Sequence, residues 1–116
     1  MSPERAKVFV IGGLQVTIKD FLKEDGHEVV LTAATKEGAI KKTKKLEALG
    51  VQVAILNNNL SVVDVNGENS QEILQALRKN APEVKVIGLS TTDIPGVDVD
   101  LGQFNLFDLK RTVTEL

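Results

Sequence analysis

The residues that follow the apolar run 53–56 occupy a place where α/β proteins often do chemistry. Three asparagines follow this run, beginning with Asn57. If the run is a central strand of an open sheet, its carboxyl end is where ligands and reacting groups gather. The amide nitrogen of Asn57 has a delocalised lone pair, so the side chain can hydrogen-bond but cannot act as a carboxylate nucleophile does. We interpret Asn57 as keeping the geometry of a site without its reactivity, with a plain loop asparagine as the alternative.

Gly12 and Gly13 follow another apolar run and form a second candidate site. A glycine pair at a helix N-terminus could cradle a phosphate, because backbone N–H groups are available there. Two glycines without a fuller glycine-rich pattern also suit a tight turn from a strand into a helix. We favour the turn as the simpler interpretation.

Acidic side chains near the end of the chain raise the question of a metal site. Asp93, Asp98 and Asp100 could supply oxygen ligands. Alternation along a strand would split them between two faces of a sheet. Asp98 and Asp100 would share a face, and we interpret them as a solvated edge. We predict no bound metal and no cofactor.

Three further features have both a functional and a structural interpretation. His27, the only histidine, is expected on the surface at the start of a strand. Phe104 and Phe107 could form an exposed binding patch, although core packing explains them equally well. A lysine-rich segment could dock an acidic partner, but a solvated helix surface is the better interpretation. Its members are Lys36, Lys41, Lys42, Lys44 and Lys45.

Composition narrows the classes of function. With 116 residues, 42% hydrophobic and 26% charged, the chain suits one globular domain spanning 1–116. A net charge of −2 and the lack of Trp and Tyr argue against nucleic-acid binding. The absence of Cys excludes disulfides and thiolate metal sites. The polar start and the short first apolar run predict no signal peptide or membrane span, so we expect a cytoplasmic protein.

Apolar runs of strand length alternate with segments of helical spacing. Residues 14–22 have helical spacing, and Thr35 could cap a second helix whose inward positions end at Leu49. The other positions expected inward in this second helix are Ala39, Ile40, Thr43 and Leu46. A third helix should bury Ile73, Leu74, Leu77 and Ala81, and a last one from residue 105 should bury Leu106, Leu109 and Val113. The expected strands are 7–11, 28–32, 51–56, 84–89 and 97–101.

The strands read as continuous apolar runs, which is typical of a parallel sheet covered on both faces. The pattern predicts an α/β fold: a doubly wound, five-stranded parallel sheet. One connection departs from it, because only residues 90–96 separate the fourth expected strand from the fifth. This link is too short for a helical crossover, so the helix between these strands is missing. We favour a parallel fifth strand, although so short a link also allows an antiparallel hairpin.

The layout resembles the receiver domain of bacterial response regulators over roughly residues 7–115. The run KVFVI and the next two residues resemble the first strand and its acidic pair, and VAILN resembles the strand that ends at the phosphate-accepting Asp. VIGLST resembles the strand that carries the switch Ser or Thr, here Ser90. GVDVDLGQF resembles the Gly-Ala-Asp-x-x-x-x-Lys-Pro signature, with Gln103 at the lysine. The resemblance implies the flavodoxin/CheY-like strand order 2-1-3-4-5.

Most of the functional positions implied by this resemblance have changed type. Gly12 and Gly13 replace the acidic pair that holds Mg²⁺ with oxygen ligands. Asn57 replaces the carboxylate nucleophile, and Gln103 replaces the lysine that neutralises phosphoryl charge. Only Ser90 keeps its type. The losses are mutually consistent, because a site without crowded carboxylates needs neither the cation nor the lysine.

We therefore interpret the chain as a pseudo-receiver, a signal-transduction module that binds proteins without being phosphorylated. The expected partner is a kinase, another regulator or an effector, and a weak homodimer is compatible with the sequence. We expect no enzymatic activity and no binding to nucleic acid or membrane. The alternatives are a small-ligand sensor with its cleft at the carboxyl ends of the strands and a phosphorelay receiver in which Asn57 is a substituted Asp. A structural or oligomerisation module would expose an apolar patch where the missing helix should lie.

Overall fold

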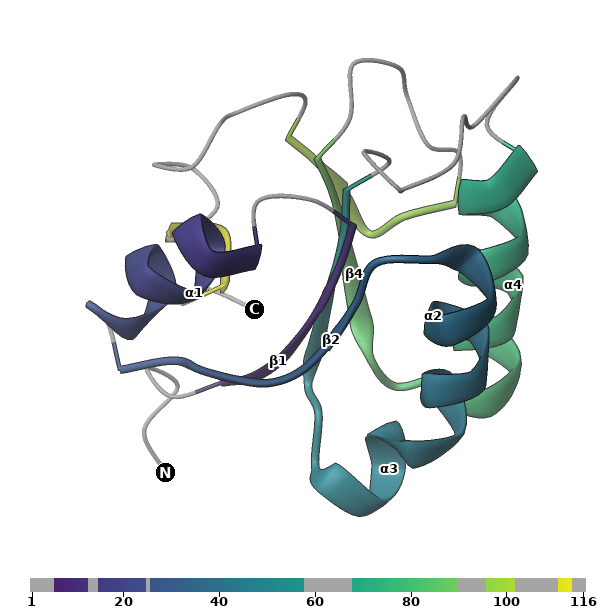
Figure 1. Ribbon diagram of the computed structural model, residues 1–116, viewed down its shortest axis with the longest axis horizontal. Coiled ribbons are helices and arrows are strands. Elements are labelled where there is room, and N and C mark those ends of the chain that lie inside the picture. The colour runs from purple at the N-terminus through teal and green to yellow at the C-terminus, as the bar shows by residue number, and fades with distance from the viewer. Residues whose placement is uncertain are drawn as a thin grey trace.

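The computed structural model describes residues 6–12, 15–24, 26–57, 68–89, 96–101 and 111–113, in which strands and helices alternate (Figure 1). Residues 111–113 are helical. The strands are β1 (Lys7–Ile11), β2 (Glu28–Ala33), β3 (Val53–Asn57), β4 (Lys85–Leu89) and β5 (Val99–Asp100). The helices are α1 (Gln15–Lys23), α2 (Lys36–Lys42), the 3-10 turn η1 (Thr43–Lys45), α3 (Leu46–Leu49) and α4 (Glu68–Asn80).

The five strands form one sheet in the order β2-β1-β3-β4-β5, and every pairing is parallel. The predicted order and direction are confirmed, including the parallel placement of β5. Observed strand ends differ from the expected ones by at most two residues. The register is regular except between β1 and β2, where Val30 is an extra residue: Val8 pairs with Val29, and Phe9 pairs with Leu31.

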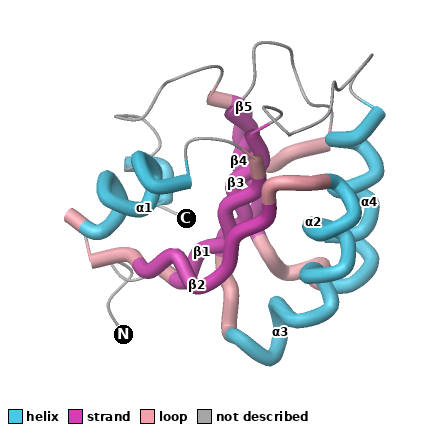
Figure 2. Tube along the Cα trace, viewed as in Figure 1, coloured by secondary structure: helices cyan, strands magenta, loops and turns pink. Residues whose placement is uncertain are grey.

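Helices cover both faces of the sheet, with α1 on one side and α2, α3 and α4 on the other (Figure 2). Each face has its own buried cluster. Phe9 and Leu56 pack with α4 residues such as Leu77 on one face. Ile55 packs with Ile18 of α1 and with Val113 on the other. The doubly wound prediction is thus confirmed, since side chains alternate between faces along each strand.

The second helical segment is not the continuous helix that we expected. The N-cap prediction is confirmed, because the Thr35 hydroxyl oxygen accepts a hydrogen bond from the Gly38 N–H at 3.0 Å. However, α2 gives way to the tighter turn η1 before α3 begins. A 3-10 turn has fewer residues per turn than an α-helix, so it rotates the residues that follow. Leu49 is 38% exposed, and its expected inward position is wrong.

A pair of polar side chains joins the η1 turn to α4. Thr43 is fully buried at 0% exposure. Its hydroxyl donates to the Ile40 carbonyl at 2.7 Å and accepts from the Asn80 side-chain amide at 2.8 Å. Both capacities of the buried hydroxyl are therefore satisfied, which is the condition for burying it at low cost.

The link from β4 to β5 is short in the structure as well. Residues 96–98 are not helical, and residues 90–95 lie outside the described part of the chain. Asp98, just before β5, and Asp100 within it are exposed, whereas Val97 packs against the buried cluster on the α4 side. On the opposite face, Val99 packs against the buried cluster. The described residues in and before β5 thus expose two carboxylates, while both valines pack against buried clusters.

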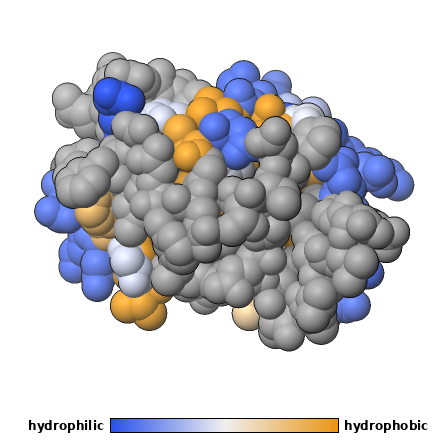
Figure 3. Space-filling view, turned by 90° about the horizontal axis from the view of Figure 1, so that it is seen from above, coloured by the Kyte–Doolittle hydropathy of each residue, from blue (hydrophilic) through white to orange (hydrophobic). Residues whose placement is uncertain are grey.

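Seen from above, hydrophilic side chains lie on both flanks of the molecule (Figure 3). This distribution is expected for helices whose apolar faces turn toward a central sheet. No helix within the described residues has both the length and the hydrophobicity to cross a bilayer.

Candidate functional site

Two of the predicted site positions lie side by side at the carboxyl edge of the sheet. The last printed pair between β1 and β3 is Ile11 with Leu56, so Gly12 and Asn57 are the next residues along the two strands. Asn57 is the last residue of β3 and pairs with Leu89 of β4. The backbone therefore brings position 12, position 57 and the end of β4 together, as the strand order requires.

The backbone of Gly12 restricts what this position can carry. Its φ angle is 104°, a value that residues with a side chain rarely adopt. Gly12 is buried, and its N–H donates to the Ala33 carbonyl at 2.8 Å, which ties the end of β1 to the end of β2. An aspartate at this position would have to strain or move the backbone. The tight-turn interpretation of this glycine agrees with the observed geometry.

The other predicted site residues cannot be placed in the same way. Gly13, Ser90 and Gln103 lie outside the described residues, as do Asp93, Phe104 and Phe107. For Asn57 the structure describes the backbone position alone. That Ser90 and Gln103 share one site with Asn57, as the resemblance implies, therefore remains a prediction.

His27 is a polar residue whose position the sequence interpretation missed. It is only 3% exposed, so the expected surface position is wrong. The Ala6 N–H donates to Nδ1 of His27 at 3.0 Å, in front of the first residue of β1. The ring therefore serves as a buried acceptor at the amino end of the sheet. The partner is 21 residues away in the sequence, and no local pattern indicates such a pairing.

Asp98 is exposed, as expected for a solvated edge, but its carboxylate also has specific partners that the sequence did not predict. Its Oδ2 accepts from the Val86 N–H at 2.7 Å and from Arg78 Nη2 at 3.2 Å. The same Arg78 nitrogen donates to the Gly96 carbonyl at 2.7 Å. We call these four residues, Arg78, Val86, Gly96 and Asp98, the β5 clamp. The clamp connects the end of α4 and the start of β4 to the residues in front of β5.

Gly96 fits the clamp because of its conformation and its surroundings. Its φ angle is 93°, and an added Cβ would lie 2.9 Å from Cδ2 of Leu74. The positive φ favours glycine at this position, and an added Cβ would also require the end of the Leu74 side chain to shift. Position 96 is the glycine of the receiver signature named above, so a structural reason for that glycine exists in this chain.

The lysines of the second helical segment are used in different ways. Lys36 pairs with Glu72 of α4 at 2.8 Å. Lys42 donates to the Thr32 carbonyl at 2.6 Å. Lys41, Lys44 and Lys45 are exposed, which agrees with the interpretation of a solvated helix surface. Among the described residues there is no group of three or more His, Cys, Asp or Glu that could hold a metal ion.

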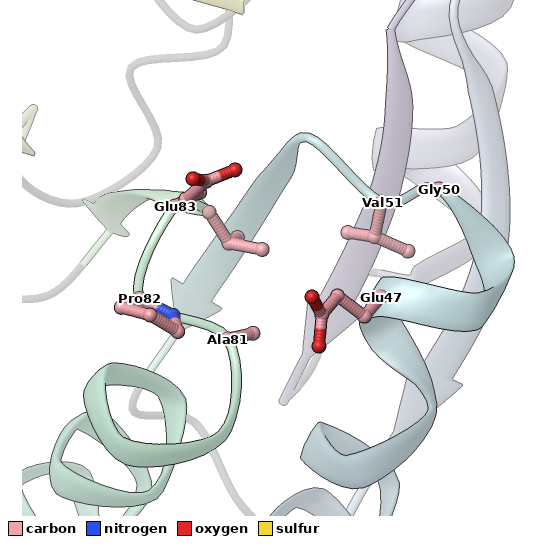
Figure 4. Close-up of a pocket in the computed structure, with 7 residues that line it drawn as sticks. Glu47, Gly50, Val51, Ala81, Pro82 and Glu83 are labelled. Atoms are coloured by element: carbon pink, nitrogen blue, oxygen red, sulfur yellow. The ribbon is translucent and has the colours of Figure 1, made fainter.

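Two hollows in the described part of the molecule lie at the opposite, amino-terminal edge of the sheet. One, of about 280 Å³, lies between the end of α3 and the turn from α4 into β4 (Figure 4). Glu47 extends from α3 on one side of it, and Pro82 and Glu83 line the other. The second, of about 360 Å³, is lined by Ala6, Lys7, Gly26 and Glu28. Neither reaches Gly12 or Asn57.

Comparisons with known proteins show the fold. No protein-family model matches the sequence, and no curated protein matches it either. Among solved structures, a chain of the CheX–CheY–BeF3–Mg²⁺ complex from Borrelia burgdorferi aligns with a TM-score of 0.74 at 15% identity, covering 95% of this chain and 87% of that one. The Francisella response regulator 1452 receiver domain aligns with a TM-score of 0.70 at 22% identity, covering 95% and 94%. A Thermotoga maritima response regulator aligns with a TM-score of 0.70 at 20% identity, covering 96% of each chain.

These similarities extend over nearly the whole described architecture. They agree with the parallel sheet and its β2-β1-β3-β4-β5 order. The chain therefore has the fold of response regulator receiver domains, as the sequence resemblance implied.

Proposed function

We propose that this chain is a pseudo-receiver, a receiver-fold module of cytoplasmic signal transduction that binds a protein partner without being phosphorylated. The observation that carries this proposal is the backbone of Gly12, whose φ angle is 104°. The resemblance implies an acidic residue at this position, where it would help to hold Mg²⁺. Because the backbone at position 12 favours glycine, replacing Gly12 by an aspartate would not by itself restore the Mg²⁺ ligand. This supports the proposal that the site no longer binds Mg²⁺.

The end of β3 supports the same proposal. Asn57 occupies the strand end that the resemblance assigns to the phosphate acceptor. An amide cannot form an acyl phosphate, and this residue lies next to Gly12 across β1 and β3. Two adjacent positions thus lack the groups that phosphoryl transfer requires.

Protein partners are the most direct use of a receiver fold without this chemistry. The Borrelia structure named above contains CheY with a protein partner, CheX. In the present chain, helices cover both faces of the sheet and turn polar side chains outward. We propose that a kinase, another regulator or an effector contacts these helical faces, and that the protein does so without enzymatic activity of its own.

The test is a titration followed by amide NMR. We expect that adding Mg²⁺ and then beryllofluoride leaves the amide signals of Gly12, Asn57 and Leu89 unchanged. The matched control is the Asn57→Asp variant, which restores the acceptor alone and should also give no saturable shift, because the ligands for Mg²⁺ are still missing. A Gly12→Asp variant should lose about 1–3 kcal/mol of stability, since an L residue is strained at positive φ.

Three outcomes would contradict the proposal. Saturable shifts at the carboxyl edge of the unmodified chain would mean that the old site still binds. Binding of beryllofluoride by Asn57→Asp alone would favour a phosphorelay receiver in which Asn57 is a substitution. A Gly12→Asp variant as stable as the parent would remove the backbone argument.

A further inference from the structure

Strand β2 forms one end of the sheet. It is first in the strand order, and among the described residues no strand pairs with its outer side. Residues 29–32 of this strand are half-buried. An open edge with apolar side chains is a template for pairing with another strand. The features that keep this edge unpaired are therefore important for the solution behaviour of the molecule.

The backbone bonds show which groups of β2 point outward. The Glu28 N–H donates to the Ala6 carbonyl at 2.9 Å, and the Ala33 carbonyl accepts from the Gly12 N–H at 2.8 Å. Both groups therefore point toward β1. Successive residues of a strand direct their backbone groups to opposite sides. The carbonyl of Thr32, which precedes Ala33, consequently points away from β1.

Lys42 hydrogen-bonds to this outward carbonyl. It is the last residue of α2, and its Nζ donates to the Thr32 oxygen at 2.6 Å. The side chain is half-buried, so its stem lies on the protein while its ammonium group lies at the edge. A strand that approached β2 from outside would have to displace this ammonium group and desolvate it.

The pairing of β2 with β1 is irregular at Val30, two residues before Thr32. The extra residue in the pairing of β2 with β1 is Val30. An extra residue of this kind bends a strand and interrupts the regular spacing of its outward groups. Val30 and Lys42 thus act on the same short edge, one through the backbone and one through a charge.

We propose that Lys42 keeps the outer edge of β2 closed, and that the edge without this lysine is a pairing surface for a second copy of the chain. A second copy fits because antiparallel pairing of one edge with itself has two-fold symmetry and closes after two chains. In a register that sets Val30 opposite Leu31, Glu28 lies opposite Ala33. No like charges meet within the paired strands, and the apolar side chains of 29–31 lie at the centre.

The experiment compares Lys42→Met with Lys41→Met. Methionine keeps an apolar stem at position 42 but cannot donate to the Thr32 carbonyl. Position 41 is the exposed neighbour on the same helix, so its variant removes the same charge without touching the edge. We expect sedimentation equilibrium of Lys42→Met to approach twice the monomer mass of 12.6 kDa as concentration rises. Hydrogen exchange of the Val29 and Thr32 amides should slow in the same samples, while Lys41→Met and Lys42→Arg should stay monomeric.

The proposal fails if Lys42→Met remains a monomer throughout the concentration range. It also fails if this variant associates while exchange at Val29 and Thr32 is unchanged, because the contact would then lie elsewhere. Equal association of Lys41→Met would point to charge loss in general and would reject a specific role of the edge. If Lys42→Met is unfolded, Lys42→Leu replaces it, since leucine also lacks a donor, and unfolding of both variants would assign the bond to fold stability and overturn the proposal.

Discussion

At the scale of single residues, His27 shows how a polar side chain can serve the fold. Its Nδ1 accepts the Ala6 N–H at 3.0 Å within a site that is 3% exposed. As an acceptor, Nδ1 carries no proton in this arrangement. Removing the imidazole would leave the Ala6 N–H buried without this acceptor. The free-energy cost of such an unsatisfied donor is usually larger than the net contribution of the hydrogen bond to stability.

We predict that His27→Leu lowers the free energy of unfolding by about 1–3 kcal/mol. Leucine keeps an apolar body of similar size but offers no acceptor to Ala6. The exposed neighbour Glu28 supplies the control, since Glu28→Leu should change stability by no more than about 0.5 kcal/mol. Urea unfolding followed by far-UV circular dichroism measures both variants. Equal stability of His27→Leu and the parent would show that the imidazole bond contributes nothing to folding.

At the scale of secondary-structure elements, β5 is a two-residue strand that pairs with β4 and is preceded by the clamp residues. In a regular ladder, the start of β4 would bond to backbone groups of the incoming strand. Here the Val86 N–H donates to the Asp98 side chain, and the Gly96 carbonyl accepts from Arg78. The β5 clamp thus adds side-chain bonds next to the backbone bond that the Asp98 N–H donates to the Val86 carbonyl at 2.9 Å. A short connection from β4 makes such an attachment necessary, because no crossover helix is predicted there to hold the strand.

We predict that Asp98→Ala lowers the free energy of unfolding by about 1–3 kcal/mol, because the half-buried Val86 bond loses its acceptor. Asp98→Asn keeps an oxygen at the same place and removes only the charge. It should lose about 1 kcal/mol or less, as expected for an ion pair that is partly exposed to water. Chemical denaturation gives the two values. Identical losses in the two variants would contradict the view that Val86 depends on the oxygen of Asp98.

At the scale of the whole molecule, the two buried clusters share one sheet. Phe9 and Val10 are neighbours on β1, yet they belong to opposite faces. Loss of the packing on one face therefore removes support from strands that also form the other. A domain of this size with one sheet between two helical layers should unfold as a unit.

We predict that Leu77→Ala on α4 and Leu22→Ala on α1 each lower stability by about 2–5 kcal/mol. Both leucines are fully buried, one in each cluster. Each variant should show a single transition in which circular dichroism and NMR amide signals from both faces are lost together. Two separate transitions, or the loss of signals from one face alone, would mean that the faces unfold independently.

The sequence alone determined the architecture, because the strand and helix patterns are local. Continuous apolar runs predicted a parallel sheet covered on both sides, and the strand order came from the resemblance to receivers. Thr35 was recognised as a cap because its partner lies three residues away. The short link after β4 was visible in the sequence too. Helical spacing failed at Leu49, because a tightened turn between α2 and α3 changes the periodicity.

The features of the candidate site also fall into those that the sequence predicted and those that only the tertiary structure shows. Residue types at positions 12 and 57 led to the proposal of a site without phosphoryl chemistry, since an amide and a glycine lack the groups that such chemistry uses. Only the tertiary structure determined the positive φ of Gly12, the acceptor role of His27 and the bonds of Asp98 and Lys42. The three side-chain bonds join residues 10 to 21 positions apart. Their geometry arises when strands pair and helices pack, and no local pattern of residue types encodes that geometry.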